Sequence, residues 1–313
     1  MYDLTIIGGG PAGVGAGVYA ARKKLKTLFL TSAADSGSRD FGGQSVVSED
    51  IQNWIGTVSV SGVNLAKMLE DHLRAYATDV IDIRVGEKAT AISKIDRIFT
   101  VTTDKASYES RSVLVTTGSH RRKLTAPGAD MFEHKGITYC ASCDGPLFAD
   151  RDVIVVGGGN AGFETAAQLL AYTKSVTLLD STDKFRADPI TVEKVLANPK
   201  MKGVLNAQIE KIEGDKFATS LTYKDTVTSA LNTIPTGGIF VEIGLVPTTS
   251  FLEGVVNLNE RKQVVADPRT QRTNVEGIWA AGDCTDVLYH QNNIAVGDAV
   301  RALEDIYIYL SRT

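Results

Sequence analysis

Two stretches of the chain share one order of apolar and polar positions. Residues 3–23, DLTIIGGGPAGVGAGVYAARK, and residues 152–172, DVIVVGGGNAGFETAAQLLAY, both open with a short apolar run. In both, three glycines follow, and then an alanine-rich segment with helical spacing. Each stretch therefore predicts a strand, a tight turn and a helix, in that order.

The glycines of both stretches have the spacing G-x-G-x-x-G. This spacing permits a tight turn and lets the backbone approach a diphosphate, which then lies at the N-terminus of the helix. Two such motifs predict an α/β protein with two Rossmann-like, three-layer nucleotide-binding domains. The glycines are Gly8, Gly10 and Gly13 in the first motif and Gly157, Gly159 and Gly162 in the second.

A third apolar strand pattern lies near the C-terminus, in VEGIWAAGDCTD at residues 275–286. It ends at Gly282 and Asp283, where a carboxylate can contact a polyol such as ribitol, and a helical pattern follows. The second nucleotide unit therefore interrupts the first. We predict an FAD-binding domain made of residues 1–119 and 246–313, with a nicotinamide-binding domain, residues 120–245, inserted between them.

Length, composition and charge narrow the class of protein. A chain of 313 residues exceeds the usual size of one core, which agrees with two domains. The net charge of −4 gives no reason to expect nucleic acid or an anionic membrane as a partner. The chain has no apolar run of membrane-spanning length. Its first residues enter a strand at once and leave no room for a signal peptide, so we expect a cytoplasmic protein.

The chain has three cysteines, Cys140, Cys143 and Cys284. They are too few for a disulfide framework, and a structural zinc site normally needs four Cys or His ligands. The C-x-x-C spacing of the first two favours a catalytic dithiol over a metal site. We interpret Cys284 as a buried, small apolar residue.

Seven motifs, taken in their order along the chain, resemble the low-molecular-weight thioredoxin reductases. They are equally similar to the flavoprotein of alkyl hydroperoxide reductase without its N-terminal thioredoxin-like extension. The motifs are GGGPAG (8–13), FGGQ (41–44), IQNWIG (51–56), TTG (116–118), YCASCDGPLF (139–148), GGGNAG (157–162) and AAGDC (280–284).

This resemblance implies non-covalent FAD, a homodimer and a redox-active pair on the nicotinamide domain. Cys143 would face the flavin, and Cys140 would attack the disulfide of a partner protein. Asp144 would be the acid/base that protonates the leaving thiolate; the alternative is that it is only a turn residue before Gly145. A carboxylate beside a thiol raises the pKa of that thiol, so a proton carrier makes more chemical sense than a thiolate stabiliser.

The resemblance also implies two sets of cofactor-binding residues. The predicted FAD set is Gly8, Gly10, Pro11, Ala12, Gly13, Gly43, Gln44, Asn53, Thr117, Gly118, Gly282, Asp283, Gln291, Asn292 and Ile294. The predicted nicotinamide set is Gly157, Gly159, Asn160, Ala161, Gly162, Asp180 and Arg186.

In this family the nicotinamide domain rotates about two linkers. We expect the hinges after Gly118 and near residues 243–247. The basic run at residues 120–123 is interpreted as a solvated hinge loop, with contact to an acidic partner as the alternative. The polar loop at residues 32–40 is interpreted as a solvated insertion.

The expected nucleotide is NADH rather than NADPH. Family members that use NADPH carry an HRRxxxR-type segment whose arginines hold the 2′-phosphate. The matching stretch here is LLDSTDKFRAD (178–188), in which Asp180 replaces the histidine and only Arg186 keeps its place. An acidic residue at this distance from the glycines binds the ribose 2′-hydroxyl of NAD, and its charge repels a 2′-phosphate.

Three functions remain open. The first is an NADH-dependent reductase of a thioredoxin- or glutaredoxin-like protein. The second uses the same chemistry to feed a peroxiredoxin through such a carrier, which we expect to be a separate chain. The third is a flavoprotein whose cysteine pair senses redox state or binds metal and catalyses little. A reductase that takes electrons from ferredoxin or another donor is a further alternative.

Overall fold

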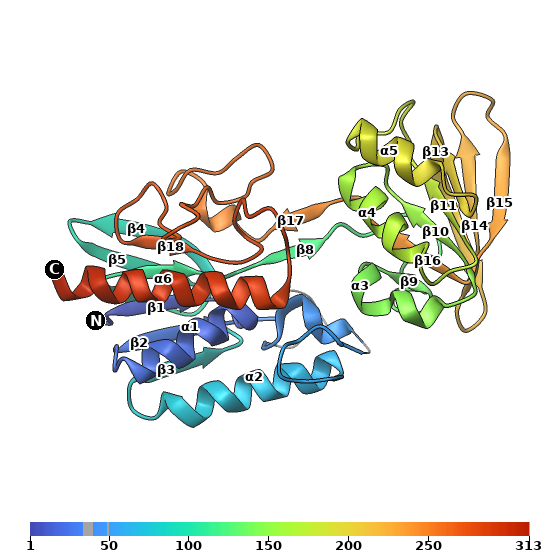
Figure 1. Cartoon of the computed structure of the whole chain (residues 1–313). Coiled ribbons are helices and arrows are strands. Elements are labelled where there is room, and N and C mark those ends of the chain that lie inside the picture. Colours follow the sequence, from blue (N-terminus) through green and yellow to red (C-terminus); the bar gives the residue numbers. More distant parts are fainter. Residues whose placement is uncertain (34–39, 49, 313) are drawn as a thin grey trace. The chain divides into compact units, whose positions relative to one another are not determined.

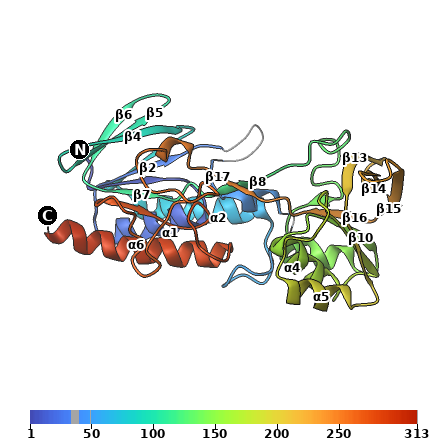
Figure 2. The same cartoon turned by 90° about the horizontal axis from the view of Figure 1, so that it is seen from above.

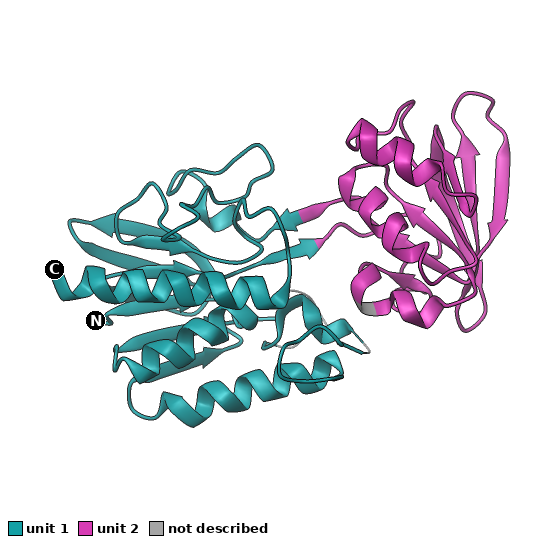
Figure 3. Cartoon of the chain, viewed as in Figure 1, with its two compact units in different colours: residues 1–120, 246–313 teal, residues 121–245 magenta. Residues whose placement is uncertain are grey.

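The computed structural model describes residues 1–33, 40–48 and 50–312. The chain divides into two compact units, and unit 2 is inserted into unit 1 along the sequence (Figure 3). Unit 1 contains residues Met1–His120 and Val246–Thr313, and unit 2 contains Arg121–Leu245. The cofactor assigned to each domain stays a prediction. Residues 34–39 of the polar loop that we interpreted as a solvated insertion lie outside the described residues.

Unit 1 is built on a parallel sheet of five strands in the order β18-β7-β1-β2-β3. Strands β1, β2, β3 and β18 are labelled in Figure 1. The three inner strands β7, β1 and β2 are buried along their whole length, which explains their largely apolar sequences. The strands are β1 (Leu4–Ile7), β2 (Thr27–Thr31), β3 (Ile81–Val85), β7 (Val113–Val115) and β18 (Ile278–Ala280).

Helices cover one face of this sheet and a small antiparallel sheet covers the other, so unit 1 has three layers (Figure 2). One apolar core lies on the helical side, and a second lies on the side of the antiparallel strands. The helices are α1 (Pro11–Arg22), α2 (Gly62–Ala77) and α6 (Asn292–Arg312), with the short 3-10 helices η1 (Gly43–Val47) and η3 (Ser250–Leu252). The antiparallel strands are β4 (Ala89–Ile95), β5 (Ile98–Thr103) and β6 (Ser107–Ser110).

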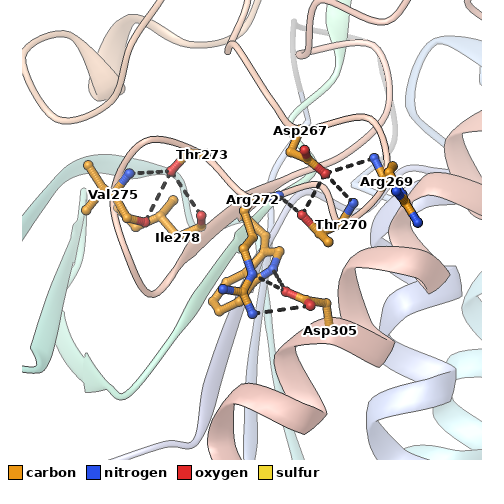
Figure 4. Close-up of polar contacts among 9 residues, drawn as sticks. Asp267, Arg269, Thr270, Arg272, Thr273, Val275, Ile278 and Asp305 are labelled. Carbon is orange, nitrogen blue, oxygen red and sulfur yellow. Dashed lines mark hydrogen bonds and ion pairs between the residues drawn. The ribbon is translucent and has the colours of Figure 1, made fainter.

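Hydrogen bonds and an ion pair connect the loop before β18 to helix α6 (Figure 4). The Arg272 guanidinium donates to both oxygens of Asp305, at 2.5 and 3.2 Å. The indole N–H of Trp279 donates to the same carboxylate at 2.9 Å. Asp267 accepts hydrogen bonds from the backbone N–H groups of Arg269 and Thr270 and so stabilises the turn that precedes Arg272. These contacts tie the C-terminal part of the chain to the strand that completes the sheet.

Unit 2 repeats the layers of unit 1. Its parallel sheet has the order β12-β11-β10-β16-β9, with helices on one face and an antiparallel sheet on the other. The parallel strands are β9 (Ile137–Thr138), β10 (Asp152–Val156), β11 (Ser175–Leu179), β12 (Met201–Val204) and β16 (Gly238–Val241). The antiparallel strands are β13 (Ala207–Gly214), β14 (Ala218–Asp225) and β15 (Leu231–Pro235). The helices are α3 (Ala141–Asp144), η2 (Gly145–Phe148), α4 (Asn160–Leu169) and α5 (Pro189–Leu196).

The chain crosses between the units in two short strands that pair with each other, β8 (Ser119–Arg121) and β17 (Leu245–Pro247). This corrects part of our interpretation of the basic run. His120 and Arg121 belong to a strand rather than to a solvated loop, because β17 supplies backbone partners that a local sequence pattern does not reveal. None of the described helices combines the length and apolar character that crossing a membrane requires.

Candidate functional site

The first glycine motif forms the turn between β1 and α1. Gly8 has φ +123°, a conformation that favours glycine, and a side chain there would overlap the backbone carbonyl of Thr116. A side chain at Gly13 would overlap the carbonyl oxygen of Gly8. Gly10 is the N-cap of α1, and no side chain caps the helix. The first N–H groups of α1 are therefore available to an anion such as a diphosphate.

A cavity of about 730 Å³ lies within unit 1, next to this turn. Its volume falls in the range of small-molecule and cofactor sites. The carboxylate of Asp283 and the open N-terminus of α1 are at its wall. A glycine cradle, a helix terminus and a carboxylate together fit a flavin dinucleotide. The predicted FAD residues that line it are Gly8, Gly10, Pro11, Ala12, Gly43, Gln44, Thr117, Gly118, Asp283 and Asn292.

Five of the predicted FAD residues do not line the cavity. Asn53 donates from its amide to Gln291 at 3.2 Å, which joins residues far apart in the sequence. Gly282 has φ +75°, and a side chain there would come within 3.2 Å of the Ala295 methyl group. The residues that do not line the cavity are Gly13, Asn53, Gly282, Gln291 and Ile294.

The second glycine motif repeats the turn between β10 and α4. Gly157 has φ +122°, and a side chain at Gly162 would overlap the carbonyl oxygen of Gly157. Gly159 is the N-cap of α4, and a side chain there would meet no atom within 4 Å. Asn160 and Ala161 form the first turn of the helix, and the side-chain carbonyl of Asn160 accepts from the backbone N–H of Asp188 at 2.8 Å. The open end of α4 fits the diphosphate of a second dinucleotide.

Asp180 follows β11 directly and lies against this turn. Only 3% of the residue is exposed, and its carboxylate accepts hydrogen bonds from the backbone N–H groups of Gly158 at 2.5 Å and Thr182 at 2.8 Å. Burial acts to raise the pKa of Asp180, but hydrogen bonds from Thr182 and Gly158 outweigh it and hold that pKa below its usual range. Arg186, 64% exposed, brings its guanidinium within 3.6 Å of the carboxylate. The structure therefore brings Asp180 and Arg186, the two predicted nicotinamide-binding residues of segment 178–188, close to the second glycine turn.

The cysteine motif belongs to unit 2, where it follows the edge strand β9. Cys140 precedes α3 and is disulfide-bonded. The side chain of Cys143 lies outside the part of the chain that the structure describes. The carboxylate of Asp144 accepts a hydrogen bond from the hydroxyl of Thr138, and its backbone N–H donates to the carbonyl of Cys140 at 3.0 Å. The predicted acid/base is thus fixed at both its backbone and its side chain.

The chain was compared with known families, curated proteins and solved structures. Residues 2–299 match the family model of the pyridine nucleotide-disulphide oxidoreductases. The chain belongs to this family. The F component of alkyl hydroperoxide reductase from Escherichia coli (strain K12) is 38% identical, over 100% of this chain and 59% of that protein. An NADH dehydrogenase of Bacillus subtilis (strain 168) is 36% identical, over 99% of this chain and 59% of that protein.

Among solved structures, thioredoxin reductase from Streptococcus pyogenes MGAS5005 matches with a TM-score of 0.88 and 31% identity, covering 100% of this chain and 99% of that one. This match confirms the predicted fold class and the predicted resemblance. Membership of the oxidoreductase family confirms the predicted enzyme class, the flavin-dependent disulfide oxidoreductases, and implies a nicotinamide nucleotide besides the flavin. The chain spans 59% of the length of the curated relatives named above.

Cys284, the third cysteine of the chain, is buried in an apolar core, as the sequence analysis predicted. It is free and fully buried in unit 1, where its thiol lies 3.4 Å from the carbonyl oxygen of Ala281. Burial raises the pKa of Cys284 to about 11. A thiol with such a pKa carries little thiolate at neutral pH, so Cys284 is unsuited to redox exchange.

Ser32, Ala33 and Asp40, at the two ends of the polar loop that we interpreted as a solvated insertion, line the cavity of unit 1. Sequence reasoning also missed two further segments that line this cavity. The first is Glu87–Thr90, at the start of the antiparallel sheet, and the second is Val246–Thr248 with Ser250 and Phe251. Neither carries a glycine or cysteine pattern. Their position follows from strand pairing between distant parts of the chain, which the linear sequence does not display.

Proposed function

We propose that the chain passes electrons from NADH through FAD to the Cys140/Cys143 pair, and from this pair to the disulfide of a thioredoxin- or glutaredoxin-like protein. The observation that carries the proposal is the placement of the cysteine motif in unit 2, on the sheet that also carries the second open glycine turn. A complete glycine turn and a cofactor-sized cavity in unit 1 support a separate flavin site.

The roles of the chain's own groups follow from disulfide chemistry. The thiolate of reduced Cys140 attacks one sulfur of the substrate disulfide, which forms a mixed disulfide and releases the other sulfur as a thiolate. Cys143 then attacks Cys140, so that the pair is oxidised and the substrate leaves as a dithiol. Asp144 holds and delivers the proton that a departing thiolate needs. FAD, when bound, accepts two electrons from the nicotinamide and passes them to the disulfide of the pair.

NADH is the proposed donor because of the carboxylate at the second glycine turn. The low pKa of Asp180 keeps it ionised, and its position against Gly158 places negative charge where a 2′-phosphate would approach. Arg186 opposes this charge, but it is one arginine and is largely exposed. We therefore expect a higher kcat/KM with NADH than with NADPH. An equal or higher kcat/KM with NADPH would contradict this choice.

A peroxiredoxin reached through a thioredoxin- or glutaredoxin-like carrier is the second candidate. It is favoured by the alkyl hydroperoxide reductase relatives, of which the Escherichia coli protein is 38% identical to this chain. Both candidates share the same chemistry up to the first protein substrate. The predicted homodimer and the predicted cytoplasmic location stay predictions.

An anaerobic titration tests the electron path. Adding NADH to the FAD-loaded protein should bleach the flavin absorbance and release two titratable thiols per chain. Retention of the oxidised spectrum under excess NADH and NADPH would contradict the proposal and favour a redox sensor or another electron donor.

A trapping experiment tests the substrate class. In the Cys143→Ser variant, Cys140 should hold its protein substrate as a mixed disulfide that dithiothreitol releases. Recovery of a thioredoxin- or glutaredoxin-like protein would support the proposal, and recovery of no thiol protein would contradict it. The Cys140→Ser variant is the matched control, since it lacks the attacking thiol.

A further inference from the structure

A buried carboxylate outside the predicted set lies at the second glycine turn. Glu242 follows β16 directly, and 6% of its side chain is exposed. Its backbone carbonyl is the group that a side chain at Gly157 would overlap. Because β10 and β16 are parallel neighbours and β10 leads into α4, Glu242 stands at the carboxyl end of the sheet, where the strand order reverses. Dinucleotides bind at such positions.

Both oxygens of Glu242 have a partner within unit 2. One accepts from the hydroxyl of Thr165 on α4 at 3.0 Å, and the other accepts from the Arg121 guanidinium at 2.9 Å. Thr165 is buried, whereas 32% of the Arg121 side chain is exposed. The pair therefore joins the helix that follows the glycine turn to the strand β8 at the edge of the unit.

The charge of this pair matters because a diphosphate carries negative charge. An uncompensated carboxylate beside the turn would repel the nucleotide, because like charges that lie close together disfavour binding. Arg121 removes this repulsion, and its exposed portion remains as positive charge at the same end of the sheet. Glu164 of α4, which is exposed, also acts on Glu242 and adds negative charge there.

We propose that the Arg121–Glu242 ion pair sets the affinity of the second glycine turn for its nicotinamide nucleotide. The positive charge of Arg121 favours nucleotide binding. Glu242 holds the Arg121 guanidinium in place, and its negative charge reduces the attraction of Arg121 for the nucleotide. The inference rests on the proposed function, since it takes this turn as the nicotinamide site. Arg121 and Glu242 act here as charged positioning residues and take no part in electron transfer.

The proposal predicts opposite effects for two single variants. Arg121→Met leaves the Glu242 charge uncompensated, so the Kd for NAD⁺ should rise roughly three- to tenfold, the order expected when one charge near a bound anion is changed. Glu242→Gln keeps the shape and leaves Arg121 charged, so the Kd should fall by a similar factor. The double variant should return to within roughly twofold of the unaltered protein.

The measurement is isothermal titration of NAD⁺ into the FAD-loaded protein at about pH 8, in low salt and again in high salt. Salt should shrink both effects because they are electrostatic. Lys174→Met is the matched control. Lys174 pairs with Asp152 at 3.1 Å, at the amino end of the same sheet, so its removal changes the net charge equally but far from the turn. Its Kd should equal that of the unaltered protein.

The outcomes separate this inference from the proposed function. If the unaltered protein binds neither NAD⁺ nor NADH, both are overturned. If it binds and both single variants weaken binding, the pair is merely structural and the inference alone is overturned. If Arg121→Met does not fold, Glu242→Gln decides: tighter binding supports the proposal and weaker binding overturns it.

Discussion

The two glycine turns have the same backbone and different surroundings. Gly8 and Gly157 have nearly equal φ values, +123° and +122°, and a side chain at either would overlap the carbonyl of the residue that follows the neighbouring strand. That residue is Thr116 in unit 1 and Glu242 in unit 2. The shared geometry follows from the need for a close backbone approach to a diphosphate, which does not depend on the rest of the cofactor.

The side chains that flank the turns differ in charge. In unit 1, β2 ends at Thr31 and β7 is followed directly by Thr116. The hydroxyl of each threonine donates a hydrogen bond to a backbone carbonyl. In unit 2 the corresponding residues are Asp180 and Glu242, and both are carboxylates. The shared backbone fits a dinucleotide at both turns. Under the proposed function, the flanking side chains decide which dinucleotide each turn prefers.

Each of the two carboxylates that flank the turn of unit 2 has one arginine near it. Arg186 lies 3.6 Å from Asp180, and Arg121 lies 2.9 Å from Glu242. Neither threonine of unit 1 needs such a counterion. The acidic turn is thus partly neutralised, and under the proposed function we expect nucleotide selectivity to depend on the balance of these charges rather than on one residue.

The largest expected effect is a difference in turnover between variants of the cysteines in the two units. Cys140→Ser in unit 2 should reduce protein disulfide reduction to background, because the attacking thiol is gone, while NADH should still bleach the flavin. Cys284→Ser in unit 1 should leave turnover within roughly twofold, since a buried thiol of high pKa is inert. Turnover assays with a thioredoxin-like substrate measure both. Loss of activity in Cys284→Ser would show that unit 1 also contributes a redox thiol.

The next largest effect is on cofactor affinity, when the third glycine of either turn is replaced by alanine. An alanine methyl group at Gly13 or Gly162 would overlap the carbonyl oxygen of Gly8 or Gly157, so the turn must open. Overpacking of this kind costs about 1–3 kcal/mol, which corresponds to a loss of affinity of up to roughly 100-fold. Gly13→Ala should purify with little flavin. Gly162→Ala should keep its flavin and lose NAD⁺ binding.

Flavin absorbance per protein and the Kd for NAD⁺ distinguish the two variants. A Gly162→Ala protein without flavin, or a Gly13→Ala protein with normal flavin content, would contradict the assignment of the cofactors to the units.

The glycine turns could be predicted from sequence because their requirement is local. The residues that need a left-handed backbone or close packing are glycines, and they lie within six positions of one another, next to a strand and a helix. The insertion of one unit into the other also followed from the order of motifs, since the third strand pattern at Gly282 and Asp283 comes after the second turn.

The flanking charges could not all be predicted, for a different physical reason. Asp180 was found because its distance from the glycines is characteristic. Glu242 was missed because its partner Arg121 is 121 residues away in the sequence, and only the folded arrangement of unit 2 brings the two together. The hydroxyl of Thr138 was likewise not recognised as a partner of Asp144.

A third effect tests the charge at the strand end. Asp180→Thr gives unit 2 the residue that unit 1 has at Thr31. Removing the like charge should lower the ratio of kcat/KM for NADH over NADPH by roughly 10- to 30-fold, mainly through better use of NADPH. Asp183→Asn is the control, because it removes an exposed carboxylate from the same loop. Equal effects of both variants would indicate general loop charge rather than a specific role of Asp180.

A smaller effect concerns the edge strand β9, which leads into the cysteine motif. Thr138→Val keeps the shape of the side chain and removes the hydroxyl that donates to Asp144. Without this hydrogen bond the side chain of Asp144 is positioned less firmly, so it should deliver its proton to a departing thiolate less efficiently. We expect a fall in kcat of roughly fivefold, the size of one net hydrogen bond. Turnover assays with a thioredoxin-like substrate measure kcat: Thr138→Ser should restore it, and Thr138→Val should add nothing to Asp144→Asn.

The smallest effect is a difference in how the two turns respond to pH. Burial raises the pKa of Glu242 and outweighs the opposing effects of Arg121 and Thr165. A carboxyl group with a raised pKa in the folded chain contributes stability that is present below its unfolded pKa, about 4.3, and is lost as pH rises through the folded pKa. Thr116, at the same place in unit 1, does not titrate.

The Tm of the unaltered protein, measured relative to that of Glu242→Gln, should therefore fall as pH rises from about 4.3 through the raised pKa of Glu242. The Tm of the unaltered protein relative to Thr116→Ser should not change with pH. Differential scanning calorimetry of the FAD-loaded proteins measures both series. A relative Tm that rises with pH in the Glu242 series would mean that the ion pair with Arg121 outweighs burial, and Glu242 would then stabilise unit 2 by its charge instead of weakening it.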